Sequence, residues 1–173
     1  MDIPMSAPAA RKRWDIKAFL HEHGGALSLI ACAFAADRLS KLWAAKSLAG
    51  TPGLPLLPFF HLSYVENTGT AFGLLSGANA FFIVFTVAVL AFLGWNWRQF
   101  VAQAGGSAAP ALIAAGALGN LYDRIFLGKV IDFLDFRVWP VFNIADSCIC
   151  IGAALLALKL LRGEDPAAKE TNE

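Results

Sequence analysis

The chain has 173 residues, of which 57% are apolar and only 16% are charged. Soluble domains carry about 25% charged residues, so this composition indicates a membrane protein. The mean hydropathy of +0.57 points the same way. With a net charge of +1, one short cationic run at residues 11–13 and otherwise scattered bases, the sequence excludes nucleic acid as a partner.

Four apolar segments come close to the length of about 20 residues that crosses roughly 30 Å of hydrocarbon. They are residues 26–46, 80–97, 108–125 and 142–161. The second carries no charge and ends in two tryptophans, which suit a headgroup interface. The predicted fold class is therefore an all-α membrane protein with four transmembrane helices, formed by residues 1–173 as a single domain.

The N-terminal region allows two interpretations. A cleaved signal peptide would use "RKRWDIK" as its basic region, "ALSLIACAFA" as its apolar core and "AFA" as its cleavage site. The apolar pattern resumes after the charges with "LWAAKSL", which favours a retained helix whose polar residues turn inward.

Lysines and arginines predict the orientation. With a cytoplasmic N-terminus, eight of the 14 lie on the cytoplasmic side, a weak positive-inside bias. Three of the other six, Arg38, Lys41 and Arg124, sit beside acidic or amide residues that commit them to a site. Both termini are therefore placed in the cytoplasm, with residues 1–25 as an extension and the polar residues 163–173 as a disordered tail.

Two segments are expected on the far side of the membrane, residues 47–79 and 126–141. The first is long and rich in proline and glycine, and its stretch "LPFFHLSYVEN" predicts one or two short strands at the membrane surface.

Polar residues within or beside the spans are candidates for a functional site, because an ionisable side chain at the centre of a membrane helix costs about 2.5–3.5 kcal/mol. In "DRLSK", Asp37 and Lys41 share one helical face. They either neutralise each other or shape a polar site. In "ENTGTAFG", Asn67 and Gly69 indicate a turn, and the small residues 69–71 allow close approach of another backbone.

Three further motifs lie near the ends of the third and fourth spans. In "GNLYDR", Asn120, Asp123 and Arg124 share a face. This cluster either satisfies itself, or Arg124 binds a carbonyl or a lipid phosphate. In "VIDFLDF", Asp132 and Asp135 are either solvated loop acids or desolvated carboxylates with a raised pKa.

"FNIADS" opens the last span with Asn143 and Asp146, three residues apart. A cap residue followed by an acid favoured by the helix dipole is a sufficient local explanation of the motif. It does not explain why other segments bring carboxylates to the same depth.

With four spans, the aspartates at positions 37, 123, 132, 135 and 146 are expected to converge at one face of the membrane. Asp132 and Asp146 have no obvious local partner there. Two carboxylates that share a proton combine acid and base catalysis, which fits an aspartic peptidase. No cysteine has a histidine near it in the sequence, and no spacing demands a metal or cofactor.

Two other classes remain as alternatives. A proton or ion carrier would spread its acids through the bilayer, whereas here they cluster at one face and the second span is wholly apolar. A structural membrane partner would lose folding or assembly, but no reaction, when single carboxylates change.

The motifs "DRLSK", "NTGTAFG", "GNLYDR", "VIDFLDF" and "FNIADS", in this order on four expected spans, closely resemble the bacterial lipoprotein signal peptidase family, signal peptidase II. The resemblance runs from about Asp37 to Gly152. It implies an aspartic endopeptidase of the bacterial inner membrane, without a cofactor, with its active site facing the periplasm. The enzyme would remove signal peptides from diacylglyceryl-modified prolipoproteins by cutting just before the lipidated cysteine.

The same resemblance implies the roles of individual residues. The catalytic pair would be Asp132 and Asp146. The residues lining or supporting the substrate site would be Asp37, Lys41, Asn67, Gly69, Asn120, Asp123, Arg124 and Asn143. A small extracytoplasmic β-sheet from the segment after the first span, contact with membrane lipid and inhibition by globomycin are also implied. Asp123 is the rival of Asp132, which is preferred because the adjacent Arg124 would hold Asp123 ionised and occupied.

Overall fold

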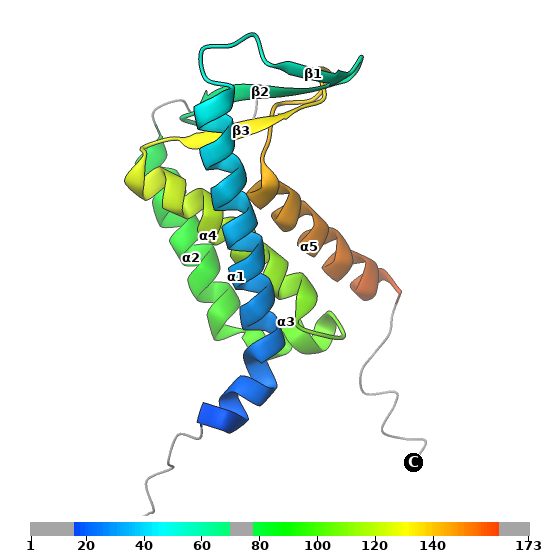
Figure 1. Cartoon of the computed structure of the whole chain (residues 1–173). Coiled ribbons are helices and arrows are strands. Elements are labelled where there is room, and N and C mark those ends of the chain that lie inside the picture. Colours follow the sequence, from blue (N-terminus) through cyan, green and yellow to red (C-terminus); the bar gives the residue numbers. More distant parts are fainter. Residues whose placement is uncertain (1–15, 70–77, 163–173) are drawn as a thin grey trace, which may run out of the picture.

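A computed structural model of the chain describes residues 16–69 and 78–162. The elements of this part are α1 (Ile16–Ser47), β1 (Leu54–Leu57), β2 (Phe60–Asn67), α2 (Asn79–Trp95), α3 (Trp97–Gln103), α4 (Ala108–Phe126), β3 (Val130–Asp135) and α5 (Ile144–Leu161). Helices dominate, as predicted, and a small sheet lies at one end of the molecule (Figure 1). The start of α1 and the end of α5 lie toward the opposite end.

Helix α4 lies at the centre of the fold, where it packs against α1, α2 and α5. Its contact with α5 depends on two glycines. A Cβ atom at Gly116 would lie 2.2 Å from the carbonyl oxygen of Ala145, and one at Gly152 would lie 2.7 Å from that of Ala109. Small residues at such contacts let two membrane helices approach closely.

The sheet joins two segments that are distant in the sequence. Its strand order is β1-β2-β3, and both neighbouring pairs are antiparallel. The prediction of one or two strands within residues 47–79 is confirmed by β1 and β2. The small sheet implied for this segment is present, and "VIDFLDF" adds a third strand, β3, which the sequence did not predict. This motif escaped prediction as a strand because five of the six β3 residues are buried, which removes the alternation of buried and exposed positions.

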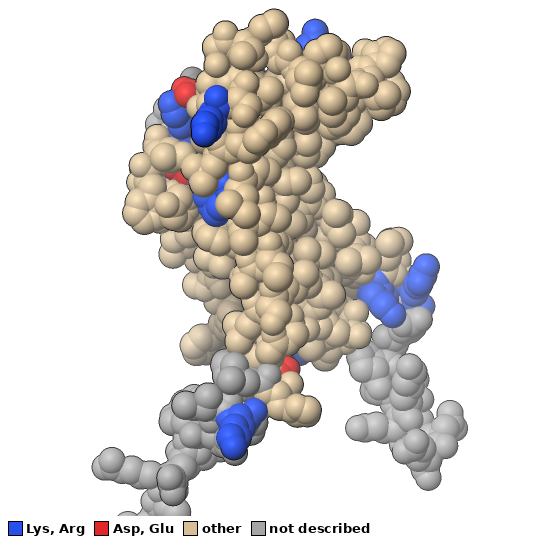
Figure 2. Space-filling view, viewed as in Figure 1, with Lys and Arg blue, Asp and Glu red and all other residues tan. Residues whose placement is uncertain are grey.

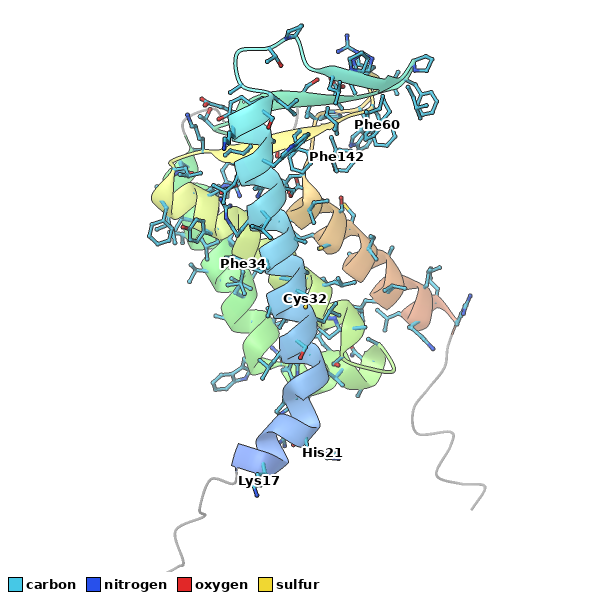
Figure 3. The ribbon with its side chains drawn as sticks, in the orientation of Figure 1. Lys17, His21, Cys32, Phe34, Phe60 and Phe142 are labelled. Carbon is cyan, nitrogen blue, oxygen red and sulfur yellow. The ribbon has the colours of Figure 1, made fainter. Side chains whose placement is uncertain are left out.

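The sheet rests on the end of α1. Ala44, Leu48 and Phe133 form a small buried core between them, and Leu62 of β2 packs against it. Phe60 and Phe142 lie at the same end of the molecule, away from Lys17 and His21 at the start of α1 (Figure 3). Strand β3 and part of β2 are thereby fixed to the helices, whereas β1 is exposed along its whole length.

Among the described residues, α5 is the one helix that is by itself long and apolar enough to cross a membrane. The pair α2 and α3 passes the same test together but bends by 74° at its break. The prediction of four transmembrane helices therefore stays a prediction. Helix α1 includes residues 16–25, whereas the expected span begins at residue 26, and α3 occupies most of the link expected at residues 98–107.

The close contact between α4 and α5 yields a prediction. Gly116→Ala places a methyl group against the α5 backbone, so it should lower the free energy of unfolding by about 1–3 kcal/mol. Gly94→Ala in α2 is the matched control, because a Cβ there meets nothing within 4 Å, and it should cause no loss. Denaturant unfolding in mixed micelles, followed by circular dichroism, measures both. Equal stability of the two variants would contradict this account of the packing.

Candidate active site

Asp132 is positioned by strand pairing. It lies opposite Val65 on β2, and Asn67 stands two residues further along the same face of that strand. The amide Nδ2 of Asn67 therefore reaches Asp132 Oδ2, at 2.9 Å. The other oxygen, Oδ1, accepts a hydrogen bond from Asn143 Nδ2 at 2.6 Å, and the residue is only 2% exposed.

Asp146 is positioned by the start of α5. Asn143 is the N-cap, and its Oδ1 accepts a hydrogen bond from the backbone N–H of Asp146 at 2.9 Å. Asp146 Oδ2 in return accepts the backbone N–H of Asn143 at 3.2 Å, which completes a capping box. The local explanation of "FNIADS" is thus confirmed, but it uses only one of the two carboxylate oxygens. The other, Oδ1, accepts Asn120 Nδ2 at 2.6 Å.

Two side-chain amides connect the carboxylates. Asn143 Nδ2, which binds Asp132, also donates to Asn120 Oδ1 at 3.1 Å, and Asn120 Nδ2 binds Asp146. Both asparagines are buried. A continuous chain of hydrogen bonds thus runs from Asp132 to Asp146.

Both carboxylates line one cavity of about 440 Å³. Its polar wall also contains Asn67, Gly69 and Arg124, whereas residues 139–142, with Trp139 at their start, form an apolar wall. A second cavity of about 280 Å³ also contains Arg124 and Asp146. Its walls are otherwise mainly apolar side chains of α2, α4 and α5, namely Phe82, Phe85, Val89, Ile113, Ala117 and Ile149. A cavity with one polar wall and a mainly apolar cavity therefore meet at the same carboxylate.

The environment of Asp132 favours its protonated form. Burial raises the pKa of Asp132 to about 6, and the nearby charge of Asp146 acts in the same direction. Hydrogen bonds from Asn67 and Asn143 and the charge of Lys41 lower this pKa, but by less. Asp132 can therefore hold a proton in weakly acidic solution beside a second carboxylate.

A cluster of four charged side chains lies behind the cavity. Lys41 Nζ is 2.9 Å from Asp37 Oδ2 and 2.9 Å from Asp123 Oδ2, and all three side chains are at most 1% exposed. Arg38 binds the other oxygen of Asp123. Lys41 Nζ also donates to Asn120 Oδ1 at 3.0 Å, which links the cluster to the amides between the carboxylates.

Comparison with known proteins shows the family to which the chain belongs. The family model for signal peptidase (SPase) II matches residues 29–162. The chain belongs to the signal peptidase II family. The lipoprotein signal peptidase of Halothermothrix orenii is 46% identical over 129 residues, covering 74% of this chain and 89% of that protein. That of Aeromonas hydrophila is 45% identical over 148 residues, covering 80% and 89%.

Solved structures agree with this assignment. Two structures described as bacterial membrane enzymes are each 30% identical to the chain, with TM-scores of 0.73 and 0.70. They cover 80% and 81% of this chain, which covers 88% and 94% of theirs. The predicted resemblance to signal peptidase II is confirmed. The chain is a membrane protein and a protease of that family.

The structure brings all ten predicted site residues of this signal peptidase together, in two layers. Asn67, Gly69, Arg124, Asp132 and Asp146 line the cavity. Asp37, Lys41, Asn120, Asp123 and Asn143 are buried behind it, where they support it. Residues 70–73 of the predicted "NTGTAFG" motif lie outside the described residues. Within the described ranges, His, Cys, Asp and Glu form no group of three or more that could hold a metal ion.

One prediction about aspartates needs correction. Asp135 lies on the same strand as Asp132, but it binds Ser63 and Arg137 and does not line the cavity. Asp123 was expected to be occupied by Arg124, yet its partners are Arg38 and Lys41. Adjacent residues on a helix point in different directions, so Arg124 is free of this role and lines the cavity.

Two residues that contribute to the site, Arg38 and Trp139, were not among the predicted site residues. Arg38 was recognised only as a cation beside polar residues, and its contact with Asp123 spans 85 positions of the sequence. Trp139 received no role, although it lines the cavity and is 65% exposed. The only sequence signal for Arg38 is a further charge between Asp37 and Lys41, which already pair with each other.

The buried cluster yields a prediction about stability. Lys41→Met removes the cation shared by Asp37 and Asp123, so it should lower the free energy of unfolding by about 3–5 kcal/mol. Lys46→Met, at an exposed position of the same helix, should change it by less than about 0.5 kcal/mol. Denaturant titration in mixed micelles measures the difference. A Lys41→Met protein as stable as Lys46→Met would show that the cluster does not hold α1 and α4 together.

Proposed function

We propose that this signal peptidase is an aspartic endopeptidase with Asp132 and Asp146 as its catalytic pair. Its substrates are diacylglyceryl-modified prolipoproteins, from which it removes the signal peptide by cutting before the lipidated cysteine. One observation carries the assignment. The two carboxylates line the same cavity and are joined by Asn143 and Asn120.

The different environments of the two carboxyl groups indicate which one acts as the base and which as the acid. Asp146 lies in the first turn of α5, where the helix dipole favours negative charge, so it serves as the base. Asp132 is buried, has a pKa of about 6 and serves as the acid. Asp146 takes a proton from a water molecule while Asp132 gives its proton to the carbonyl oxygen of the scissile bond.

The water oxygen adds to the carbonyl carbon and forms a tetrahedral intermediate. When the intermediate collapses, the C–N bond breaks and the leaving amine takes the proton held by Asp146. One hydroxyl of the intermediate returns its proton to Asp132, which restores the starting state. The amides of Asn67 and Asn143 hold the Asp132 carboxyl in a fixed orientation.

The two cavities suit the two parts of a lipidated substrate. Asn67 and Gly69, at the end of β2, offer polar contacts to an extended peptide in the larger cavity. Arg124 lines both cavities, and its guanidinium lies 5.1 Å from the ring centre of Phe82. There its donors can bind an ester carbonyl of the diacylglyceryl group. The apolar cavity offers contacts to an acyl chain or to the signal peptide, and globomycin is expected to compete for these cavities.

Three features support four transmembrane helices. Asp37 and Lys41 of α1 and Asp123 of α4 lower the mean hydropathy of their helices, but these side chains point into the protein rather than toward lipid. The visible surface between the two ends of the molecule carries few charges (Figure 2). Lys17 and the end of α5, which carries Lys159, lie toward the end away from the sheet, which suits the cytoplasmic side (Figures 1 and 3).

In this arrangement both termini are cytoplasmic, with residues 1–25 as an extension and residues 163–173 as a tail. The sheet and the catalytic pair then lie at the periplasmic face of the inner membrane. This location suits a substrate whose signal peptide crosses the membrane and whose cleavage site emerges at that face. Contact with membrane lipid follows from the same placement.

Cleavage of a purified, diacylglyceryl-modified prolipoprotein in detergent tests the catalytic pair. Asp132→Asn and Asp146→Asn should each lower kcat by about 10²- to 10⁴-fold, because each removes one partner in proton transfer. Asp135→Asn is the matched control on the same strand and should cleave at the rate of wild type, since Asp135 lies outside the cavity.

Asp123→Asn distinguishes the rival assignment in the same assay. Residual cleavage by this variant together with loss in Asp132→Asn supports the proposed pair. If Asp132→Asn cleaves and Asp123→Asn does not, the first acid is wrongly named. A wild-type protein that never cleaves this substrate would overturn the function itself.

The pKa of Asp132 predicts the pH dependence. This pKa is raised to about 6, so Asp132 holds its proton below that pH and loses it above. Because kcat/KM reports the free enzyme, it should fall as pH rises through about 6. Asn67→Ala removes a hydrogen bond that lowers this pKa, so the fall should move to higher pH. A kcat/KM that stays constant between about pH 5 and 8 would exclude Asp132 as the proton donor.

A further inference from the structure

Arg38 is the one member of the buried charge cluster that touches neither an asparagine of the site nor a backbone group next to a proposed catalytic residue. The other three do. Asp37 Oδ1 accepts the backbone N–H of Ala145, the neighbour of Asp146, at 3.0 Å. Asp123 Oδ2 accepts the backbone N–H of Ile131, the neighbour of Asp132, at 3.3 Å. Lys41 binds Asn120.

The charges of the cluster balance only when Arg38 is counted. Asp37 and Asp123 contribute two negative charges, and Lys41 supplies one positive charge to both. Arg38 supplies the second, by binding Asp123 and lying 4.0 Å from Asp37 Oδ2. Among the described residues no neutral donor binds that oxygen of Asp37, so Lys41, at 2.9 Å, and Arg38 offset its charge.

The surroundings hold the guanidinium in place. Its central carbon lies 4.5 Å from the ring centre of Tyr122, and Phe34, one turn earlier on α1, packs edge-on against the same ring. Phe34 points from α1 toward α4 (Figure 3). The Arg38 side chain is only 14% exposed. A surface arginine that merely marks membrane topology would not be covered in this way.

We propose that Arg38 is a positioning residue for the peptidase reaction, which acts through Asp123 and whose positive charge lets Lys41 serve both buried carboxylates. The proposal rests on the catalytic pair proposed above. Without Arg38, one buried carboxylate has no counter-charge. It must then take up a proton or draw Lys41 toward itself. Either change disturbs the bonds that place Ile131 or Asn120, and with them Asp132 or Asp146.

The test compares Arg38→Gln with Arg38→Lys in the prolipoprotein cleavage assay, with kcat expressed per folded enzyme. Arg38→Gln should lower kcat about 10- to 100-fold, because misplaced catalytic groups lose much of their effect. Its KM should stay within about twofold of wild type, since Arg38 does not line the substrate cavities. Arg38→Lys keeps the charge and should recover most of kcat.

Arg137→Gln is the matched control, because Arg137 also pairs with an aspartate near the sheet but is 56% exposed and outside the cluster. It should keep the wild-type kcat. The proposal is overturned if Arg38→Gln keeps its kcat, or if Arg38→Lys falls as far as Arg38→Gln. Wild type and Asp132→Asn in the same assay report on the proposed function independently of Arg38.

Discussion

The mutual neutralisation of four buried charges is the constraint on which the rest of the structure depends. Charges as deeply buried as those of Asp37, Lys41 and Asp123 are tolerated only when they are paired. Each carboxylate also accepts a backbone N–H from another element, at Ala145 of α5 or Ile131 of β3. The pairing that lets α1 lie against α4 therefore also places the two elements that carry the proposed catalytic pair.

Neutral side-chain amides connect the charged cluster to the proposed catalytic pair by hydrogen bonds. Asn120 accepts hydrogen bonds from Lys41 and Asn143 and donates one to Asp146. A cation at position 120 would hold nearby carboxylates ionised, whereas an amide leaves them able to share a proton. The positive charge of Lys41 is thus kept one side chain away from Asp146. This separation is compatible with the raised pKa of Asp132.

The contacts that could be predicted from the sequence are those that follow from the spacing of residues along one helix. The Asp37–Lys41 pair and the cap of α5 follow from residues three or four positions apart. The contact between Arg38 and Asp123 joins two helices, and no local spacing encodes it. The assignment of Arg124 to Asp123 failed because adjacency in sequence was taken for contact. Strand β3 was missed because burial on both faces removes the alternation that marks a strand.

Asp146 shows how a structural role and a catalytic role can share one side chain. The capping box uses Oδ2, and Asn120 binds Oδ1, so neutral hydrogen-bond donors orient the carboxylate. A carboxylate oxygen has two lone pairs, and one hydrogen bond leaves the second available to a water molecule. The amide of an asparagine could still accept the capping bond but could not take up a proton. The cap therefore explains why a polar residue stands at position 146, and the demand for a base explains why that residue is an acid.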